Sequence, residues 1–289
     1  MHIRATVAAV SGALALSAFV MPAAQAADSA PSYRAEAAKV LAGHSGKTAF
    51  SADAAAADLD VSFSDLKIAS AVKVGTTNHV STTVTYTLTH GADVDITSDD
   101  FANGPLIYKG SYTTPDNVLF GDDPATCTAT SATTASCSGK IDIYPAEGDL
   151  INSDAGKWSA GALALNYSTS ASHEQGDLGS TLVQRYSKLT VNAAPEPVTK
   201  GKTVTVTGKL SRANWEDNKY HGYTVQPVKL QFRKKDSSTY TTLKTITSDS
   251  TGNLKTTTTA TVDGYFRYSF AGTTTTPAVN ATGDYVDVQ

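Results

Sequence analysis

The side chains best suited to chemistry in this chain are carboxylates that lie close together in the sequence. Four of them fall within one short polar segment: Asp93, Asp95, Asp99 and Asp100. Carboxylate oxygens are the ligands that Ca²⁺ prefers in proteins. The segment lacks the glycine at position six and the glutamate at position twelve of an EF-hand loop. It therefore predicts either a calcium site of another kind or a solvated loop that keeps the protein soluble.

A second group of side chains is aromatic and lies further along the chain. Residues 215–223 read Trp-Glu-Asp-Asn-Lys-Tyr-His-Gly-Tyr, and the aromatic members are Trp215, Tyr220 and Tyr223. Aromatic side chains on a long loop are typical of surfaces that contact a partner, such as a protein or a polysaccharide. They are equally typical of an ordered loop that covers the end of a β-sandwich. Both interpretations stay open on the sequence alone.

The two cysteines, Cys127 and Cys137, enclose nine residues that are mostly Thr, Ser and Ala. In an exported protein such a pair is expected to be oxidised, and it would then join the two strands of one hairpin. Closing so short a loop contributes a little under ~3 kcal/mol of stability in the chain-entropy model. A redox function is disfavoured because redox-active cysteines are separated by two residues near the start of a helix.

Residue patterns that perform catalysis are missing from the sequence. The histidines are scattered, and no pair of them has the spacing of metal ligands. The chain has no Gly-x-Ser-x-Gly, His-Glu-x-x-His or phosphate-loop motif. We therefore expect no enzyme activity. The formal net charge of −4 also argues against nucleic acid as a partner.

The elements that must position these groups are predicted to be short strands. Apolar residues alternate with polar ones over residues 59–64, 83–89 and 140–143, and period-two alternation is typical of half-buried antiparallel strands. No segment after Leu59 shows a helical period of useful length. The high content of Thr agrees, because β-branched residues favour strands.

A second series of strands begins near Leu189. Alternation recurs over residues 203–207, 228–233 and 266–270, and about seven short strands fit into the last ~100 residues. This density predicts an immunoglobulin-like sandwich, in which two sheets face each other and the alternating apolar residues fill the space between them. Because residues 185–191 contain no Gly/Ser linker, we expect the two series to be joined directly and semi-rigidly.

The segment Asp154-Ala155-Gly156-Lys157-Trp158 precedes a predicted strand. It resembles the corner that fixes the entry of strand F in immunoglobulin-like domains, with Trp in place of the usual Tyr. We predict that Trp158 is a core residue, and that its indole N–H takes over the hydrogen bond of the missing hydroxyl group. The alternative is an exposed platform for a carbohydrate.

The N-terminus has the pattern of an export signal. Arg4 is followed by a nearly unbroken apolar run over residues 6–20, and Ala24 and Ala26 form a small-x-small cleavage site. The run is short for a membrane span, which needs ~20 residues. Further on, Ser32 can cap a helix over residues 33–41, for which we find no packing surface in the sequence.

These observations define four parts of the chain. Residues 1–26 are predicted to be a signal peptide cleaved after Ala26, residues 27–57 an Ala-rich flexible leader, residues 58–188 an immunoglobulin-like sandwich with the local disulfide, and residues 189–289 a second such sandwich. The predicted fold class is therefore all-β, with two immunoglobulin-like β-sandwich domains in tandem.

Four segments of the second predicted sandwich carry a family resemblance: LTVNAAPEPV at 189–198, GKTVTVTGKL at 201–210, VKLQFRKK at 228–235 and DGYFRYSFAG at 263–272. Their order resembles secreted immunoglobulin-like proteins of actinobacteria, especially of Streptomyces. Members of this family are mostly uncharacterised, and some are named calcium-binding protein. The resemblance implies a secreted tandem sandwich, and it supplies no ligand residues that can be transferred.

Together, the sequence predicts a secreted, non-enzymatic binding or structural module of the extracellular space or the cell surface. One alternative is a calcium-binding module stabilised by the acidic segment of the first sandwich, with Ca²⁺ as the one cofactor considered. Another is an accessory protein that binds cell-wall material or polysaccharide. The expected partner is accordingly an extracellular protein or a cell-wall glycan, and we expect no membrane span.

Overall fold

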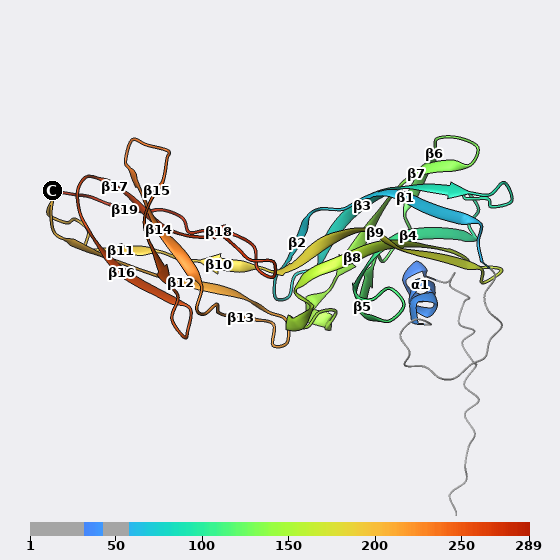
Figure 1. Cartoon of the computed structure of the whole chain (residues 1–289), viewed down its shortest axis with the longest axis horizontal. Coiled ribbons are helices and arrows are strands. Elements are labelled where there is room, and N and C mark those ends of the chain that lie inside the picture. Colours follow the sequence, from blue (N-terminus) through green and yellow to red (C-terminus); the bar gives the residue numbers. More distant parts are fainter. Residues whose placement is uncertain (1–31, 43–57) are drawn as a thin grey trace, which may run out of the picture. The chain divides into compact units, whose positions relative to one another are not determined.

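The computed structural model describes residues 32–42 and 58–289, and nearly all of its regular structure is β (Figure 1). The predicted all-β fold class is confirmed. The predicted signal peptide and most of the predicted leader, residues 1–31 and 43–57, lie outside the described residues. Among the described residues, no helix is long and apolar enough to cross a membrane.

Nine strands build the first sandwich. They are β1 (Val61–Lys67), β2 (Ala71–Val74), β3 (Val80–His90), β4 (Phe101–Gly110), β5 (Pro115–Phe120), β6 (Thr126–Ala129), β7 (Thr134–Ile143), β8 (Gly156–Asn166) and β9 (Ser172–Arg185). Two short 3₁₀ helices, η1 (Pro145–Glu147) and η2 (Asn152–Asp154), lie between β7 and β8.

The strand order of the first sandwich is that of an immunoglobulin domain. One sheet has the order β1-β3-β7-β6 and the other β2-β9-β8-β4-β5. The pair β2 and β9 is parallel, and all the other pairs are antiparallel. With β1 as strand A, the two sheets read A-B-E-D and A′-G-F-C-C′, which is the arrangement of an immunoglobulin sandwich with one added C′ strand.

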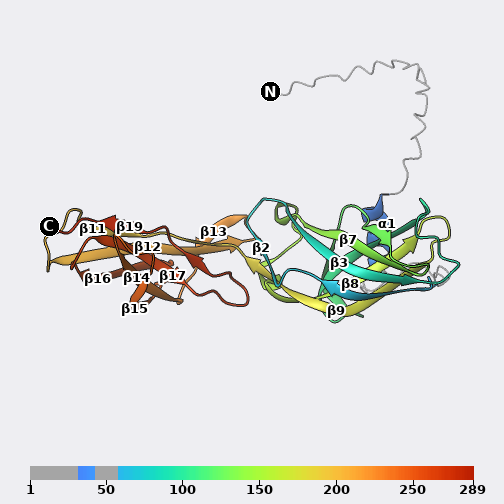
Figure 2. The same ribbon diagram turned by 90° about the horizontal axis from the view of Figure 1, so that it is seen from above.

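Ten short strands build the second sandwich. They are β10 (Ser187–Leu189), β11 (Asn192–Ala194), β12 (Thr203–Asn214), β13 (Lys219–Gly222), β14 (Pro227–Lys234), β15 (Thr241–Thr247), β16 (Asn253–Thr259), β17 (Gly264–Phe270), β18 (Val279–Asn280) and β19 (Asp284–Val286). In one sheet β10, β11, β13 and β16 all pair with β12, and the other has the order β15-β14-β17 with β18 and β19 on the far side of β17. Figure 2 shows the strands of both sandwiches from above.

The alternation read from the sequence becomes the inward and outward faces of these strands. In β3 the side chains of Val84, Tyr86 and Leu88 are buried, whereas Thr85 and Thr89 between and beyond them are exposed. The second sandwich follows the same rule along β12 and β17, and its core includes Val204, Leu230 and Tyr268. Burial of alternate apolar side chains between two sheets is the main stabilising contribution to such a fold.

Helix α1 (Tyr33–Ala42) corrects one expectation. The backbone N–H of Ala35 donates to Ser32 Oγ at 3.3 Å, so the predicted cap forms. The helix also has a packing surface, contrary to our reading of the sequence, because its three buried side chains lie on the outer face of the sheet containing β4 and β8. These side chains are Tyr33, Ala37 and Leu41, and they pack with Ala102, Leu106, Tyr108, Leu163 and Leu165.

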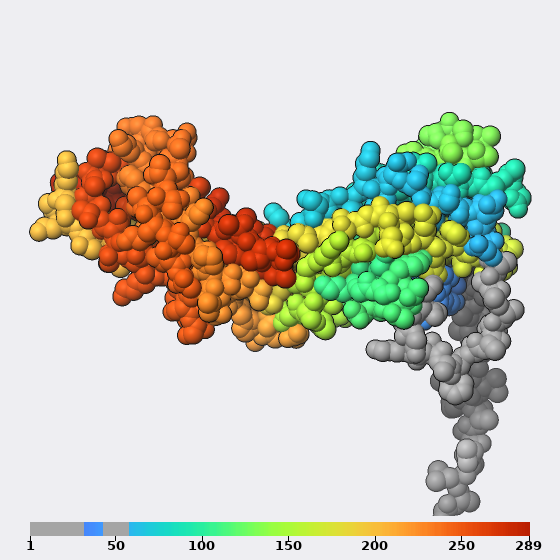
Figure 3. Space-filling view, in the orientation of Figure 1, coloured from blue at the N-terminus to red at the C-terminus, as the bar shows by residue number. Residues whose placement is uncertain are grey.

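The physical reason is that β8 is apolar on both faces. Ala162 and Ala164 point into the sandwich core, and Leu163 and Leu165 point to the other side, so a second layer is needed to cover them. In Figure 3 the blue atoms of α1 lie beside the yellow atoms of the layer formed by β8 and β9. The part of the predicted flexible leader that the structure describes is thus a packed helix.

Candidate functional site

A concave surface lined by several carboxylates lies at the loop end of the first sandwich. This acidic hollow has a volume of about 360 Å³, and it is bounded by the loop from β3 to β4, the loop from β8 to β9 and the residues before β1. Its lining comprises Asp58, Leu59, Asp60, Asp93, Val94, Asp95, Ser98, Phe101, Asn166 and Thr169. In immunoglobulin variable domains, loops in these positions form the binding surface.

Two of the predicted calcium ligands, Asp93 and Asp95, line the acidic hollow, while Asp99 and Asp100 do not. Asp95 Oδ1 accepts hydrogen bonds from the hydroxyl of Thr97 at 2.7 Å and from its backbone N–H at 2.9 Å. These bonds, the hydroxyl first, hold the pKa of the Asp95 carboxyl below its usual value. One carboxylate of the hollow is therefore fixed in its charged form by its own loop.

Asp58 and Asp60 were not predicted as site residues, yet they add two carboxylates to the hollow. Asp58 Oδ1 lies 2.8 Å from His173 Nδ1. The backbone oxygen of Asp60 accepts a hydrogen bond from Gly91 N–H at 2.8 Å, which places Asp60 beside the loop that carries Asp93. No sequence signal marked them, because it is the pairing of β1 with β3, with Val61 opposite His90, that brings the residues before β1 to the start of that loop.

Gly91 lies where these two segments meet. A Cβ atom at this position would lie 2.2 Å from Asp60 Oδ2 and 2.7 Å from Asp93 Oδ1. Both carboxylates therefore lie against the backbone of one glycine. Within residues 32–42 and 58–289, no three Asp, Glu, His or Cys side chains form a group that could hold a metal ion. The calcium site stays a prediction.

The position of Trp215 bears on the two interpretations that the sequence leaves open for residues 215–223. Its side chain is only 2% exposed and belongs to the buried cluster of the first sandwich. The indole Nε1–H donates to the backbone oxygen of Gly75 at 2.9 Å. A side chain in this position offers no ring face to a glycan, so Trp215 is a packing residue.

The two tyrosines of the same segment are half-buried. Lys188 Nζ lies 3.6 Å from the ring centroid of Tyr220, and the guanidinium of Arg212 lies 4.0 Å from that of Tyr223. Tyr223 also makes an edge contact with Phe270, with the ring centroids 5.7 Å apart. Cation–π contacts of this kind occupy ring faces that a sugar would need. The structure therefore favours the second interpretation, an ordered loop at the end of a sandwich.

Trp158 and the cysteines behave as the sequence predicts. Trp158 is 1% exposed, and its Nε1–H donates to the backbone oxygen of Asp154 at 2.7 Å. Cys127 and Cys137 form a disulfide between directly opposed residues of β6 and β7, so it joins two strands of one hairpin. The side-chain amide of Asn103, from the facing sheet, donates to Cys127 Sγ at 3.3 Å.

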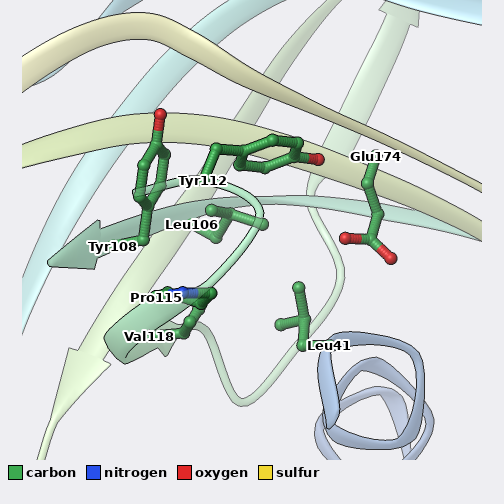
Figure 4. A pocket seen from close by; sticks show the side chains of 7 residues that line it. All are labelled: Leu41, Leu106, Tyr108, Tyr112, Pro115, Val118 and Glu174. Atoms are coloured by element: carbon green, nitrogen blue, oxygen red, sulfur yellow. The ribbon is translucent and has the colours of Figure 1, made fainter. Parts of the chain in front are cut away.

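A smaller apolar cavity lies between the C-terminal end of α1 and the sheet (Figure 4). It measures about 10 Å³ and is lined by Leu41, Leu106, Tyr108, Tyr112, Pro115, Val118 and Glu174. A single water needs roughly 10–15 Å³ of this kind of space. The cavity is therefore a packing defect beneath the helix and too small for a larger ligand.

Three histidines each contact one aspartate, and each belongs to a different loop or strand. His79 Nε2 lies 2.9 Å from Asp142 Oδ1, and His221 Nε2 lies 2.6 Å from Asp217 Oδ2. The His79 ring also stacks on Tyr144, with the ring centroids 4.3 Å apart and the planes 5° from parallel. These pairs, like that of His173 with Asp58, fix local structure at the surface.

Comparisons with known proteins add little beyond the strand order. No protein-family model matches the chain, and no curated protein matches it. A marsupial T cell receptor aligns with 79% of this chain and 73% of its own, at 14% identity and a TM-score of 0.35. Fibronectin(III)-like modules of Clostridium thermocellum CbhA align with 77% of this chain and 92% of their own, at 13% identity and a TM-score of 0.27. The D0-D1 domain of intimin aligns with 78% of this chain and 98% of its own, at 16% identity and a TM-score of 0.26.

Proposed function

We propose that this chain is a non-enzymatic module of the extracellular space or the cell surface, which binds a partner or supports other molecules structurally. The observation that carries the proposal is the loop end of the first sandwich. Loops from three separate segments meet there around the acidic hollow, on a scaffold whose two sheets hold their ends in place. Rigid sheets that display loops at one end are suited to recognition.

The disulfide supports the proposed compartment. Disulfides persist in oxidising environments outside the cytosol, and Cys127 and Cys137 account for all the cysteine in the chain. The proposed signal peptide at residues 1–26 and the resemblance to secreted actinobacterial proteins favour the same location. We propose that the mature chain starts at Ala27.

The charge of the hollow favours one kind of partner over another. Four carboxylates line it, no Lys or Arg is among its described lining residues, and one of the carboxylates, Asp58, contacts the imidazole of His173. Like charges disfavour an anionic cell-wall polymer at this end of the molecule. We therefore propose that the partner is an extracellular protein that presents Lys or Arg side chains to the hollow.

The test combines location and binding. The culture of the source organism is separated into medium, washed cell surface and cytosol, and the intact mass of the protein is measured in each fraction. We expect a species that begins at Ala27, outside the cytosol. Purified mature protein is then titrated with a Lys-rich peptide, in parallel with a variant carrying Asp60→Asn, Asp93→Asn and Asp95→Asn. Loss of binding in the variant supports the acidic hollow as the binding site. A protein found in the cytosol overturns the proposed extracellular location and with it the proposal.

The calcium-stabilised module is a second proposal, favoured by the fact that Asp93 and Asp95 line the same hollow as Asp58 and Asp60, although no three of them are grouped as metal ligands. It is tested by melting the mature protein in excess Ca²⁺ and then in chelator. An ion present at 100 times its dissociation constant adds ~2.7 kcal/mol to the stability of the folded state, so the midpoint should rise clearly. An identical melting midpoint in both solutions overturns the calcium proposal. The polysaccharide proposal is weakened because Trp215 is buried.

A further inference from the structure

The two sandwiches share a hydrophobic core. Ala213 and Trp215 lie on and just after β12, a strand of the second sandwich, but they are buried in the same cluster as Val74, Leu150 and Trp158 of the first. Trp215 is also tied to the first sandwich by its hydrogen bond to the backbone of Gly75. The second sandwich thus supplies side chains that the first needs to fill its interior.

Polar contacts surround this shared core. The side-chain amide of Asn152, in η2, donates to Asn214 Oδ1 at 2.7 Å, and Asn152 Oδ1 accepts from the backbone N–H of Trp215 at 3.1 Å. One asparagine of the first sandwich therefore holds two consecutive residues of the second. Such bonds fix the direction in which Trp215 enters the cluster, because both partners of each bond have defined positions.

A second contact involves the loop from β17 to β18. The side chain of Gln184 donates to the backbone oxygen of Thr273 at 2.9 Å, and the backbone N–H of Arg185 donates to Thr275 O at 3.0 Å. Within the second sandwich, Ser187 Oγ of β10 donates to Pro277 O at 2.9 Å and so anchors this loop. This loop therefore binds the last residues of β9. It is a second segment of the second sandwich, separate in the sequence from the β12–β13 hairpin.

Arg185 connects both contacts. Its Nε–H donates to the backbone oxygen of Ala213 at 2.6 Å, and the residue is only 8% exposed. Burial, together with the positive charge of Arg212, lowers the pKa of Arg185 to about 10. Burial of a guanidinium costs free energy because the charge loses its water. In Arg185 the backbone oxygen of Ala213, from the second sandwich, replaces part of that water. Separation of the sandwiches would leave it without this carbonyl partner.

We propose that the two sandwiches fold and unfold as one cooperative unit, with Trp215 as the side chain that couples them. Interfaces between neighbouring domains of one chain are commonly small and polar and allow relative motion. Here a large aromatic side chain crosses into the neighbouring core, and the two sandwiches, residues 58–289, belong to one compact unit. Unfolding of the second sandwich would withdraw Trp215 and open a cavity in the first, which destabilises it in turn.

The chain offers a direct test because both of its tryptophans, Trp158 and Trp215, lie in the core of the first sandwich. Tryptophan fluorescence therefore follows the first core together with the side chain that the second sandwich inserts into it, while calorimetry follows the whole mature chain. For the unaltered protein we expect one calorimetric transition, equal calorimetric and van't Hoff enthalpies, and a fluorescence midpoint that coincides with it. Two resolved transitions in the unaltered protein overturn the proposal.

Variants separate coupling from ordinary loss of stability. In Trp215→Ala we expect two resolved transitions, the lower one followed by the fluorescence of Trp158. The matched control is Lys219→Ala, an exposed residue of the same hairpin, which should keep a single transition at an unchanged midpoint. If Trp215→Ala does not fold, the double variant Asn152→Ala with Gln184→Ala weakens the contact without opening the core. A single unchanged transition in every folded variant overturns the coupling.

Discussion

At the scale of single residues, most of the polar side chains described here serve structure. Asp142 is an example: it is 7% exposed, and its carboxylate accepts hydrogen bonds from the backbone N–H of Asp122 at 3.1 Å and from His79 at 2.9 Å. Burial raises the pKa of this carboxyl, but the hydrogen bonds from Ser81, Asp122 and His79 outweigh it, so the pKa lies below its ordinary value.

This shift predicts how stability depends on pH. Because the pKa of Asp142 is lower in the folded state than the ~3.9 of an unfolded chain, its contribution is complete above that pH. It is lost as the pH falls through the folded pKa. In urea unfolding, Asp142→Asn should lose on the order of 1 kcal/mol at pH 7 relative to the unaltered protein. The difference should shrink below pH 4, and a difference that stays constant down to pH 2.5 contradicts the assignment.

At the scale of elements, α1 depends on one glycine of β4. A Cβ atom on Gly104 would lie 2.1 Å from the hydroxyl oxygen of Tyr33, which is 4% exposed beneath the helix. The strand therefore leaves a gap in its outer face, and the tyrosine of the helix fills it. A further anchor is the ion pair between Arg34 and Asp122 at the N-terminal end of the helix.

Gly104→Ala is accordingly expected to displace α1. The helix has ten residues, too few to be stable alone in water, so it should unfold once Tyr33 leaves the sheet. Trypsin cleavage after Arg34 and Lys39 should become at least tenfold faster, while the sandwich stays folded by circular dichroism. The control is Gly179→Ala on β9, where the nearest atom to an added Cβ lies at 3.7 Å. Equal cleavage rates in both variants contradict the packing of Tyr33.

The sequence predicts elements better than it predicts their neighbours. Alternation identified the strands because burial of one face is recorded in consecutive residues, as in Val84, Tyr86 and Leu88. The packing of α1 was missed, although the run Ala162–Leu165 is apolar on both faces and signals a second covering layer. The place of Trp215 stayed open between two interpretations because a single aromatic residue in a polar segment carries no information about which distant core receives it. Asp60 was missed because only the pairing of strands brings it to Gly91.

At the scale of the whole molecule, the covering of apolar surface decides how the protein behaves in solution. The outer face of the β4–β8 sheet carries Leu106, Tyr108, Leu163 and Leu165, and α1 packs against this cluster through Tyr33, Ala37 and Leu41. Contiguous exposed apolar patches of this kind mark association sites or cause aggregation. The helix thus contributes to solubility as well as to stability.

Removal of residues 27–57 should expose this face. We expect the shortened protein to keep its β-type circular dichroism, since both sandwich cores lie outside the deleted part. It should bind the dye ANS several-fold more strongly, and it should form dimers or larger species by light scattering at concentrations where the mature protein is monodisperse. Adding Leu106→Ser and Leu163→Ser to the deletion provides the matched control, because it removes apolar surface from the same face. If association is caused by that face, these substitutions restore monodispersity; if they do not, the newly exposed surface lies elsewhere and the covering function assigned to α1 is wrong.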